Sequence, residues 1–343
     1  MNSIKKLFKK YWLFIILALI VGTLLSFYTI NKFGGDGIKK DLSLIPSPKI
    51  KEFSLNTSLN YSELQKEKIN IKEENVYEVD NTLISDKEAI SIAQKFNFKI
   101  IPKVYQDQEN NNIFYEWSEE DKYLSINLSM AEIEYQKNNL ESISQEKGVL
   151  LNPDQAEEIA RKFLEDFQFL PPENIDLILI SKKYLQINEV YFNEIKSPQE
   201  ANLLQLDFQY QINEKNLLET FISVYLTKNN DIFRLIYNPS FKEIKNIGLY
   251  PLKTKEEIIK KLETINFLHY IDKKGYYVTS DEIKNLSTVS LNKIEVTYLK
   301  TKQKENYLIP LFLISGKGTL KNGEQVEISL YLPAVKDDYL LNP

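Results

Sequence analysis

The sequence predicts an α+β fold, in which an N-terminal transmembrane helix is followed by tandem units of one helix packed on a small antiparallel β-sheet. Three observations lead to this prediction: an uncharged run near the N-terminus, a helix phrase that recurs along the chain, and strand-like segments after each copy. The 343 residues are 43% hydrophobic and 27% charged, the balance of a globular protein, and their number suggests about two folded units.

The uncharged run covers residues 11–30 and follows a short tail, residues 1–10, that contains lysines but no acid. A helix of twenty residues is ~30 Å long, which matches the hydrocarbon core of a bilayer. The interface residues of this anchor are Lys9, Lys10, Tyr11, Trp12 and Tyr28. A cleaved signal peptide is the alternative, and the bulky residues that end the run disfavour it. We expect a single-pass cell-membrane protein, with a cytoplasmic N-terminus and an extracytoplasmic bulk, that contacts the lipid bilayer through residues 11–30.

The remaining composition excludes several kinds of site. Residues 1–32 hold five lysines, so 38 basic side chains stand against 48 acidic ones in the rest of the chain, a net charge of about −10. Nucleic acid is an unsuitable partner for such a surface, because binding depends on neutralising phosphates. Cysteine is absent and histidine occurs once, at His269, so thiolate and multi-histidine metal sites are excluded. We expect no cofactor and no metal.

A helix phrase occurs three times after a linker at residues 31–78. The first copy begins with the capping box Ser85-x-x-Glu88, the second with Asn152 and Pro153, and the third with Thr254 and Glu257. The first two copies share the pattern A-x-x-I-A-x-K-F, at residues 89–96 and 156–163. The spacing of their apolar residues predicts one buried helix face in each copy.

Each helix phrase is followed by three segments that alternate like β-strands. These segments are residues 113–117, 123–128 and 132–136, then 203–212, 220–227 and 232–237, then 294–299, 308–316 and 325–332. Residues 228–231 are expected to form a hairpin loop, and Asn322-Gly323 is expected to form a type I′ turn. The predicted units are therefore residues 79–140, 150–245 and 250–343, and the last two can share one domain.

The first unit resembles a PepSY domain, through residues 84–93 for its opening helix and residues 123–129 for its central strand. The later units resemble the membrane-anchored YycH/YycI-type proteins, through residues 307–313 and 325–335. The resemblance implies a non-enzymatic role, in which the protein inhibits, senses or holds a partner protein at the outer face of the membrane. It transfers no catalytic residue.

For several candidate sites, a structural role explains the residues better than a functional role does. His269 has no accompanying nucleophile or metal motif, so a structural or surface position is favoured. Residues 315–319 (SGKGT) lack the full phosphate-loop pattern, and a strand with a bulge is favoured. Residues 107–112 lack the glycine of a calcium loop. The acids Glu116, Glu119, Glu120 and Asp121 are best explained as a solvated hairpin.

The strongest candidate is a strand edge that pairs with a partner protein. Proline is tolerated mainly at sheet edges or bulges, and Pro310 lies inside an apolar run. We therefore expect residues 307–314 at an edge, with Tyr307, Ile309, Pro310 and Phe312 as partner-binding residues. The alternative places the same residues in the core.

These observations favour a non-enzymatic protein that binds an envelope or membrane protein. One alternative is an envelope hydrolase that uses carboxylates on a glycan or peptide, which predicts two acids converging in a cleft with at least one raised pKa. Another is a purely structural spacer.

Overall fold

The structure is a computed structural model, and its large compact unit begins at Ile45. It describes residues 42–341 except 49–52, 56, 81–83, 108–111, 151, 189–190, 219, 240, 242, 266, 274–275, 278–285 and 301–305. The predicted tail and membrane anchor lie outside the described residues, and so do all five proposed interface residues, Lys9, Lys10, Tyr11, Trp12 and Tyr28.

The described helices are α2 (Asp86–Lys95), α3 (Leu140–Ser144), α4 (Pro153–Asp166) and α5 (Lys255–Leu262), with short 3₁₀ helices η1 (Leu64–Lys66) and η2 (Asp337–Tyr339). The strands are β1 (Ile45–Pro46), β2 (Phe53–Ser54), β3 (Leu59–Asn60), β4 (Glu73–Val79), β5 (Lys103–Gln106), β6 (Ile113–Glu119), β7 (Lys122–Asn127), β8 (Glu132–Lys137), β9 (Asp176–Asn188), β10 (Tyr191–Ile195), β11 (Leu203–Ile212), β12 (Lys215–Asn216), β13 (Phe221–Thr227), β14 (Ile232–Asn238), β15 (Ile244–Pro251), β16 (Phe267–Leu268), β17 (Tyr270–Lys273), β18 (Tyr276–Tyr277), β19 (Leu286–Lys300), β20 (Tyr307–Leu320), β21 (Gln325–Pro333) and β22 (Leu340–Leu341).

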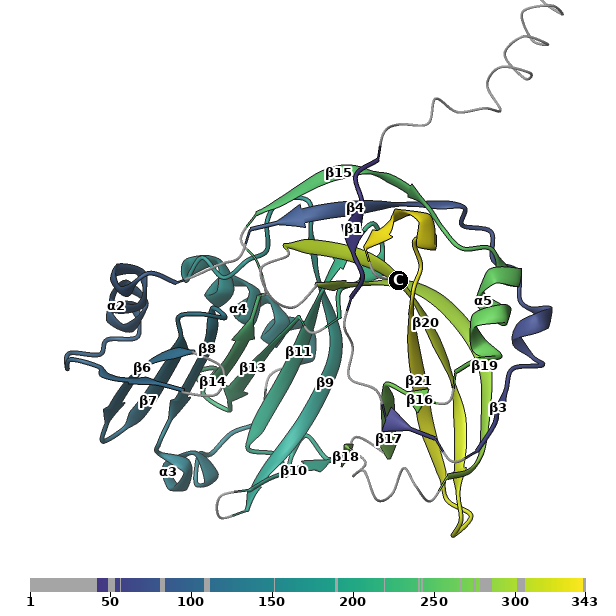
Figure 1. The fold of residues 1–343 in the computed structure, drawn as a ribbon. Helices are drawn as coiled ribbons and strands as arrows, with labels where there is room; N and C mark the ends of the chain where they lie inside the picture. Colours follow the sequence, from purple (N-terminus) through teal and green to yellow (C-terminus); the bar gives the residue numbers. More distant parts are fainter. Residues whose placement is uncertain are drawn as a thin grey trace, which may run out of the picture. The chain divides into compact units, whose positions relative to one another are not determined.

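The predicted α+β fold of tandem small sheets is wrong. The structure is mainly β: of the residues it describes, 51% lie in strands and 17% in helices. A ten-stranded sheet has the order β10-β9-β11-β13-β14-β8-β7-β6-β5, with β12 beside β11 (Figure 1). Strands of the first and second expected units are joined in it, because β14 pairs antiparallel with β8. This pairing satisfies backbone groups that two separate small sheets would each leave open at an edge.

A second sheet of eight strands contains the C-terminal part of the chain together with β4. Its order is β15-β4-β20-β21-β17-β18, and β19 pairs with β20 and with β3. The long strands β19 and β20 form its central antiparallel pair. A strand from before the first helix, β4, thus pairs with β20, which lies more than 200 positions later, and local sequence patterns do not reveal this pairing.

The three helix starts are confirmed. The Ser85 and Thr254 side chains accept hydrogen bonds from the Glu88 and Glu257 amides in complete capping boxes. Asn152 caps α4 through the Asp154 amide, with Pro153 in the first turn. Alanines on the buried faces of α2 and α4 let both helices approach the same hydrophobic core on the ten-stranded sheet.

The hairpin at Asn322-Gly323 is present, but it is not the predicted type I′ turn. Only Gly323 has a positive φ, of 85°, and the Leu320 amide donates to the Glu324 carbonyl across a longer loop. The loop at residues 228–231 has the same design, with Asn230 at φ 67°. A turn with two successive positive φ angles occurs instead at Asn213 and Glu214, between β11 and β12.

The two large sheets contact each other through β4, β12 and β19. The Thr297 hydroxyl donates to the Asn216 carbonyl at 2.7 Å, and the Leu218 amide donates to the Tyr298 carbonyl at 2.8 Å. The buried carboxylate of Glu74 forms an ion pair with Lys215 at 2.8 Å. Tyr298, which is fully buried, belongs to the same hydrophobic core as α2 and α4.

The prediction of a single-pass membrane protein must be corrected. In the part of the chain that the structure describes, no helix combines the length and the apolar character needed to cross a bilayer. The transmembrane helix, the signal anchor and the cell-membrane location therefore have no structural support.

Candidate functional site

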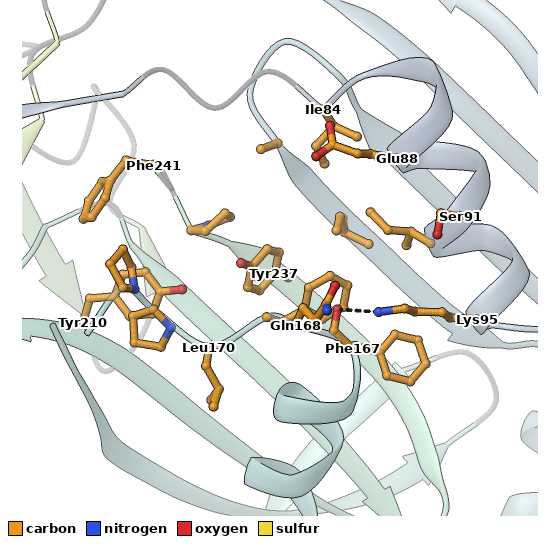
Figure 2. A pocket seen from close by; sticks show the side chains of 17 residues that line it. Ile84, Glu88, Ser91, Lys95, Phe167, Gln168, Leu170, Tyr210, Tyr237 and Phe241 are labelled. Atoms are coloured by element: carbon orange, nitrogen blue, oxygen red, sulfur yellow. Dashed lines mark hydrogen bonds between the residues drawn. The ribbon is translucent and has the colours of Figure 1, made fainter. Parts of the chain in front are cut away.

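A pocket lies on the ten-stranded sheet between α2 and the segment that follows α4. Its volume is about 360 Å³, near the lower end of the range of about 300–1,000 Å³ that is usual for ligand sites. It is open to solvent on one side. Figure 2 shows the lining side chains, which are Ile84, Glu88, Ser91, Ile92, Lys95, Ala131, Ile133, Phe167, Gln168, Phe169, Leu170, Pro171, Pro172, Tyr210, Tyr237, Pro239 and Phe241.

The segment after α4 forms one wall because of the way the helix ends. The Phe169 amide donates to the Leu164 carbonyl at 2.7 Å, and Gln168 adopts φ 62°, so the chain reverses sharply after the last turn. The reversal places the Phe169 ring in a stack on Tyr237, with centroids 4.5 Å apart. The two prolines that follow continue this wall. The wall is therefore built from aromatic and proline groups that have little freedom to move.

Helix α2 forms the opposite wall and supplies the polar side chains. The Glu88 carboxylate accepts from the Ser85 amide and hydroxyl, at 2.8 and 2.9 Å, as part of the capping box. The Lys95 ammonium donates to the carbonyls of Phe167 and Asp166 at the C-terminus of α4, at 3.3 and 3.5 Å (Figure 2). A cation at this position interacts favourably with the helix dipole and fixes the distance between the two walls.

The floor of the pocket contains two tyrosines from neighbouring parts of the sheet. Tyr210 in β11 is 1% exposed, and its hydroxyl makes no hydrogen bond of normal geometry. Burial raises the pKa of Tyr210 well above its usual value, and the adjacent Tyr237 hydroxyl raises it further. Burial also raises the pKa of Tyr237 to about 12. Both hydroxyls are therefore neutral at physiological pH, and they are the polar groups of an otherwise apolar floor.

The pocket does not carry the paired carboxylates that a hydrolase of this type needs. Glu88 is its one carboxylate among the described lining residues, and the capping box already uses it. Glu132 has a pKa raised by burial, but it accepts from Asn127 elsewhere on the sheet. Among the described residues, no cluster of three or more His, Asp and Glu side chains could hold a metal ion.

The predicted partner-binding edge at residues 307–314 is wrong. On one side β20 pairs with β19 from Leu308 onward, and on the other side it pairs with β21 and β4. Pro310 is accommodated because β21 has ended there, and its carbonyl accepts from the Ala334 amide at 3.0 Å. Ile309 and Phe312 are fully buried, and Tyr307 is half-buried. These residues lie in the core of the eight-stranded sheet, as in the alternative interpretation.

The single histidine occupies a structural position. His269 lies between β16 and β17, where its Nδ1 accepts from the Tyr331 amide at 2.9 Å. Burial lowers its pKa to about 4, so the ring is neutral at physiological pH. His269 is far from the pocket in the sequence and lies at the other large sheet, where it packs against Tyr331 of β21.

The remaining motifs also lie in strands and turns. The segment at residues 315–319 is part of β20, where a Cβ on Gly316 would lie 1.9 Å from the Ser290 carbonyl oxygen, beside a bulge in β19. Glu120 and Asp121 form the turn of the β6–β7 hairpin, and Glu119 pairs with Lys122 at 3.4 Å. Glu116 accepts from the hydroxyls of Tyr105 and Tyr123, at 3.1 and 2.6 Å. Of the segment at residues 107–112, only the two end residues are described.

The sequence motifs did not predict the pocket. One signal for it is a repeated F-x-F motif, at residues 96–98 and 167–169, that follows each of the first two helices. One residue after the second copy comes Pro171-Pro172, which indicates a rigid segment. The floor residues Tyr210 and Tyr237 had no local signal, because they meet only through the order of strands in the sheet.

Comparison with known proteins finds no sequence match and a weak structural similarity. No model of a known protein family matches this chain, and no curated protein matches it in sequence. Among solved structures, the chain is similar to the crystal structure of an uncharacterized protein from Eubacterium rectale, with 11% sequence identity and a TM-score of 0.45. The likeness covers 84% of this chain and 92% of that chain. The resemblance to PepSY domains and YycH/YycI-type proteins gains no support from these comparisons.

Proposed function

We propose that this protein is a non-enzymatic binding protein, and that its pocket between α2 and the end of α4 holds an apolar side chain of a partner protein. The observation that carries the proposal is the pocket itself, a preformed hollow of about 360 Å³ with aromatic and proline walls and an open side. A small open pocket of this kind suits a side chain that projects from a larger surface.

The surroundings of the pocket support a protein partner. Leu170 on the pocket wall is apolar and 42% exposed. Apolar side chains around a pocket contribute to binding when a partner covers them and excludes water. The carboxylate pair that would favour a hydrolase is missing among the described lining residues.

The proposal can be tested by comparing equivalent positions of α2 and α4, which begin with the same sequence phrase. Ser91 on α2 lines the pocket, whereas Glu158 occupies the equivalent position of α4 and does not. The full chain and the variants Ser91→Trp and Glu158→Trp are immobilised, and proteins retained from an extract of the source cells are compared by mass spectrometry. We expect a partner that is retained by the unmodified protein and by Glu158→Trp but lost with Ser91→Trp.

Equal retention by all three proteins, or no retention above an empty resin, would contradict the proposal. Hydrolysis of a glycan or peptide by the unmodified protein, abolished in Glu88→Gln, would replace it with the enzymatic alternative. Circular dichroism of each variant verifies that the substituted helices are still folded.

A further inference from the structure

The floor of the pocket has unused hydrogen-bonding capacity. The Tyr210 hydroxyl is buried without a hydrogen bond of normal geometry, which is an uncommon and costly state for a polar group. Tyr237, at 8% exposure, is the neighbouring hydroxyl, and Figure 2 shows its side chain in the middle of the lining residues. A hydroxyl can donate one hydrogen bond and accept others, so the two tyrosines can form a further hydrogen bond with a third group.

The charged groups of the pocket lie on α2 and are already engaged. Glu88 accepts from Ser85, and Lys95 donates to the two carbonyls at the C-terminus of α4. Among the described lining residues, none of those contributed by the sheet strands carries a charge. An anion on the floor would lose its hydration without gaining an opposite charge.

We propose that the pocket selects an apolar group that ends in a neutral oxygen, such as a phenol, an alcohol or an amide carbonyl. The oxygen accepts a hydrogen bond from the Tyr237 hydroxyl, and Tyr237 in turn accepts one from Tyr210. This inference rests on the proposed function, because it names the chemistry of the side chain that a partner inserts. It distinguishes that side chain from a plain hydrocarbon, which leaves the Tyr237 hydroxyl without an acceptor. It also distinguishes it from a carboxylate, because the cation among the described lining residues, Lys95, lies on α2 and not on the floor.

Three small probes of similar shape test the selectivity without any partner protein. Toluene, p-cresol and p-toluate present a methyl-substituted ring with no polar group, a neutral hydroxyl and a carboxylate, respectively. Binding of each to the full chain is measured at pH 7 by titration calorimetry and by chemical shifts of the pocket residues. One added hydrogen bond predicts that p-cresol binds roughly 3- to 10-fold more tightly than toluene, and p-toluate binds least tightly.

Two conservative variants test whether the preference for p-cresol over toluene comes from the tyrosines of the pocket floor. Tyr210→Phe and Tyr237→Phe keep the rings, so each is expected to bind toluene as the unmodified protein does. Tyr237→Phe should lose the preference for p-cresol, and Tyr210→Phe should weaken it. Tyr135→Phe is the matched control, because Tyr135 is also buried on this sheet but does not line the pocket. This control is expected to keep the full preference.

The outcomes separate this inference from the proposed function. The inference is overturned if no probe binds, if p-toluate binds as tightly as p-cresol, or if the preference survives both floor variants. Probe selectivity without any partner that depends on Ser91 would support the chemistry of the floor and contradict the protein-binding function. A partner lost with Ser91→Trp, together with no selectivity among the probes, would support the function and overturn the inference.

Discussion

Helices α2 and α4 begin with the same sequence phrase and pack on the same sheet, but they end differently. The matched residues Phe96 and Phe163 contact each other, with ring centroids 6.2 Å apart. Helix α2 ends at that point, whereas α4 continues for another turn before it reaches its own reversal at Gln168. The extra turn carries Phe167 and the residues after it across the sheet, where they form one wall of the pocket.

A difference of one helical turn between two similar helices is therefore enough to form a wall of the pocket. If both helices ended alike, the two reversals would be equivalent and the segment after α4 would not extend toward α2. The difference also explains why Lys95 and Lys162, which occupy matching positions, behave differently. Lys95 reaches the carbonyls at the end of α4, while Lys162 is exposed and does not line the pocket.

The largest expected effect comes from removing the packing of the extra turn. Leu164 is fully buried in this turn, and α2 has no counterpart to it. Leu164→Ala should lower the free energy of unfolding by about 2–5 kcal/mol, because it leaves a cavity in the core. Urea denaturation measures the change, and Glu165→Ala, on the exposed face, should stay within about 0.5 kcal/mol. A loss below 1 kcal/mol at Leu164, on the scale of an ordinary surface change, would show that the turn is not packed as described.

Lowering the pH should reduce the stability that His269 gives to the eight-stranded sheet, without changing the ligand selectivity of the pocket. His269 has a folded-state pKa lowered to about 4, below its unfolded value, so between these values the unfolded chain binds more protons. The free energy of unfolding should therefore fall as the pH drops from about 6.5 to about 4. The fall attributable to this group is on the order of 2 kcal/mol.

The variant His269→Gln isolates this effect from carboxyl groups such as Asp337, whose pKa is also lowered and which also lose stability in acid. The pH dependence of urea unfolding should be shallower in the variant. The selectivity for p-cresol should be unchanged over the same range, because the floor tyrosines remain neutral. An identical slope in both proteins would contradict the half-buried position of His269.

The two helix caps should have similar effects on stability and different effects on the pocket. Ser85→Ala and Asn152→Ala should each cost about 1 kcal/mol, since each removes a cap from the first turn. Only Ser85→Ala removes a hydrogen bond to Glu88, which lines the pocket. We expect weaker p-cresol binding in that variant alone, measured by calorimetry. The same loss of affinity in both variants would mean that the caps act on the pocket through overall stability.

Glycine substitutions at the two chain reversals that end α2 and α4 should change the free energy of unfolding by different amounts. Asn97 and Gln168 have φ angles of 60° and 62°, and asparagine tolerates this conformation better than glutamine. Gln168→Gly should raise the free energy of unfolding by roughly 0.5–1 kcal/mol, while Asn97→Gly should change it by less. Thermal and urea unfolding provide the measurement. A larger gain at Asn97 would reverse the comparison.

The smallest effect is expected for the matched lysines. Lys95→Met removes a cation from the C-terminus of α4 and should cost roughly 0.3–1 kcal/mol, decreasing with added salt. Lys162→Met should be nearly neutral at any salt concentration. Equal effects would show that the contact between Lys95 and the α4 carbonyls does not contribute to stability.

Local features could be predicted from the sequence because they depend on residues close in the chain. The caps at Ser85, Asn152 and Thr254 were found from their own spacing, since a capping box involves only four consecutive residues. The nine expected strands correspond to strands of the structure, and residues 203–212 match β11 at both ends. The exclusions based on cysteine and histidine need only composition.

The tertiary structure alone decided how these strands combine and where the site lies. The pairing of β8 with β14 and of β4 with β20 brings together segments that are distant in the chain, and alternation along one strand carries no information about its neighbour. For the same reason Pro310 was placed at an edge although its strand is paired on both sides. Tyr210 and Tyr237 became the floor of one pocket because strand order and the extra turn of α4 surround them, and both depend on contacts that no local pattern contains.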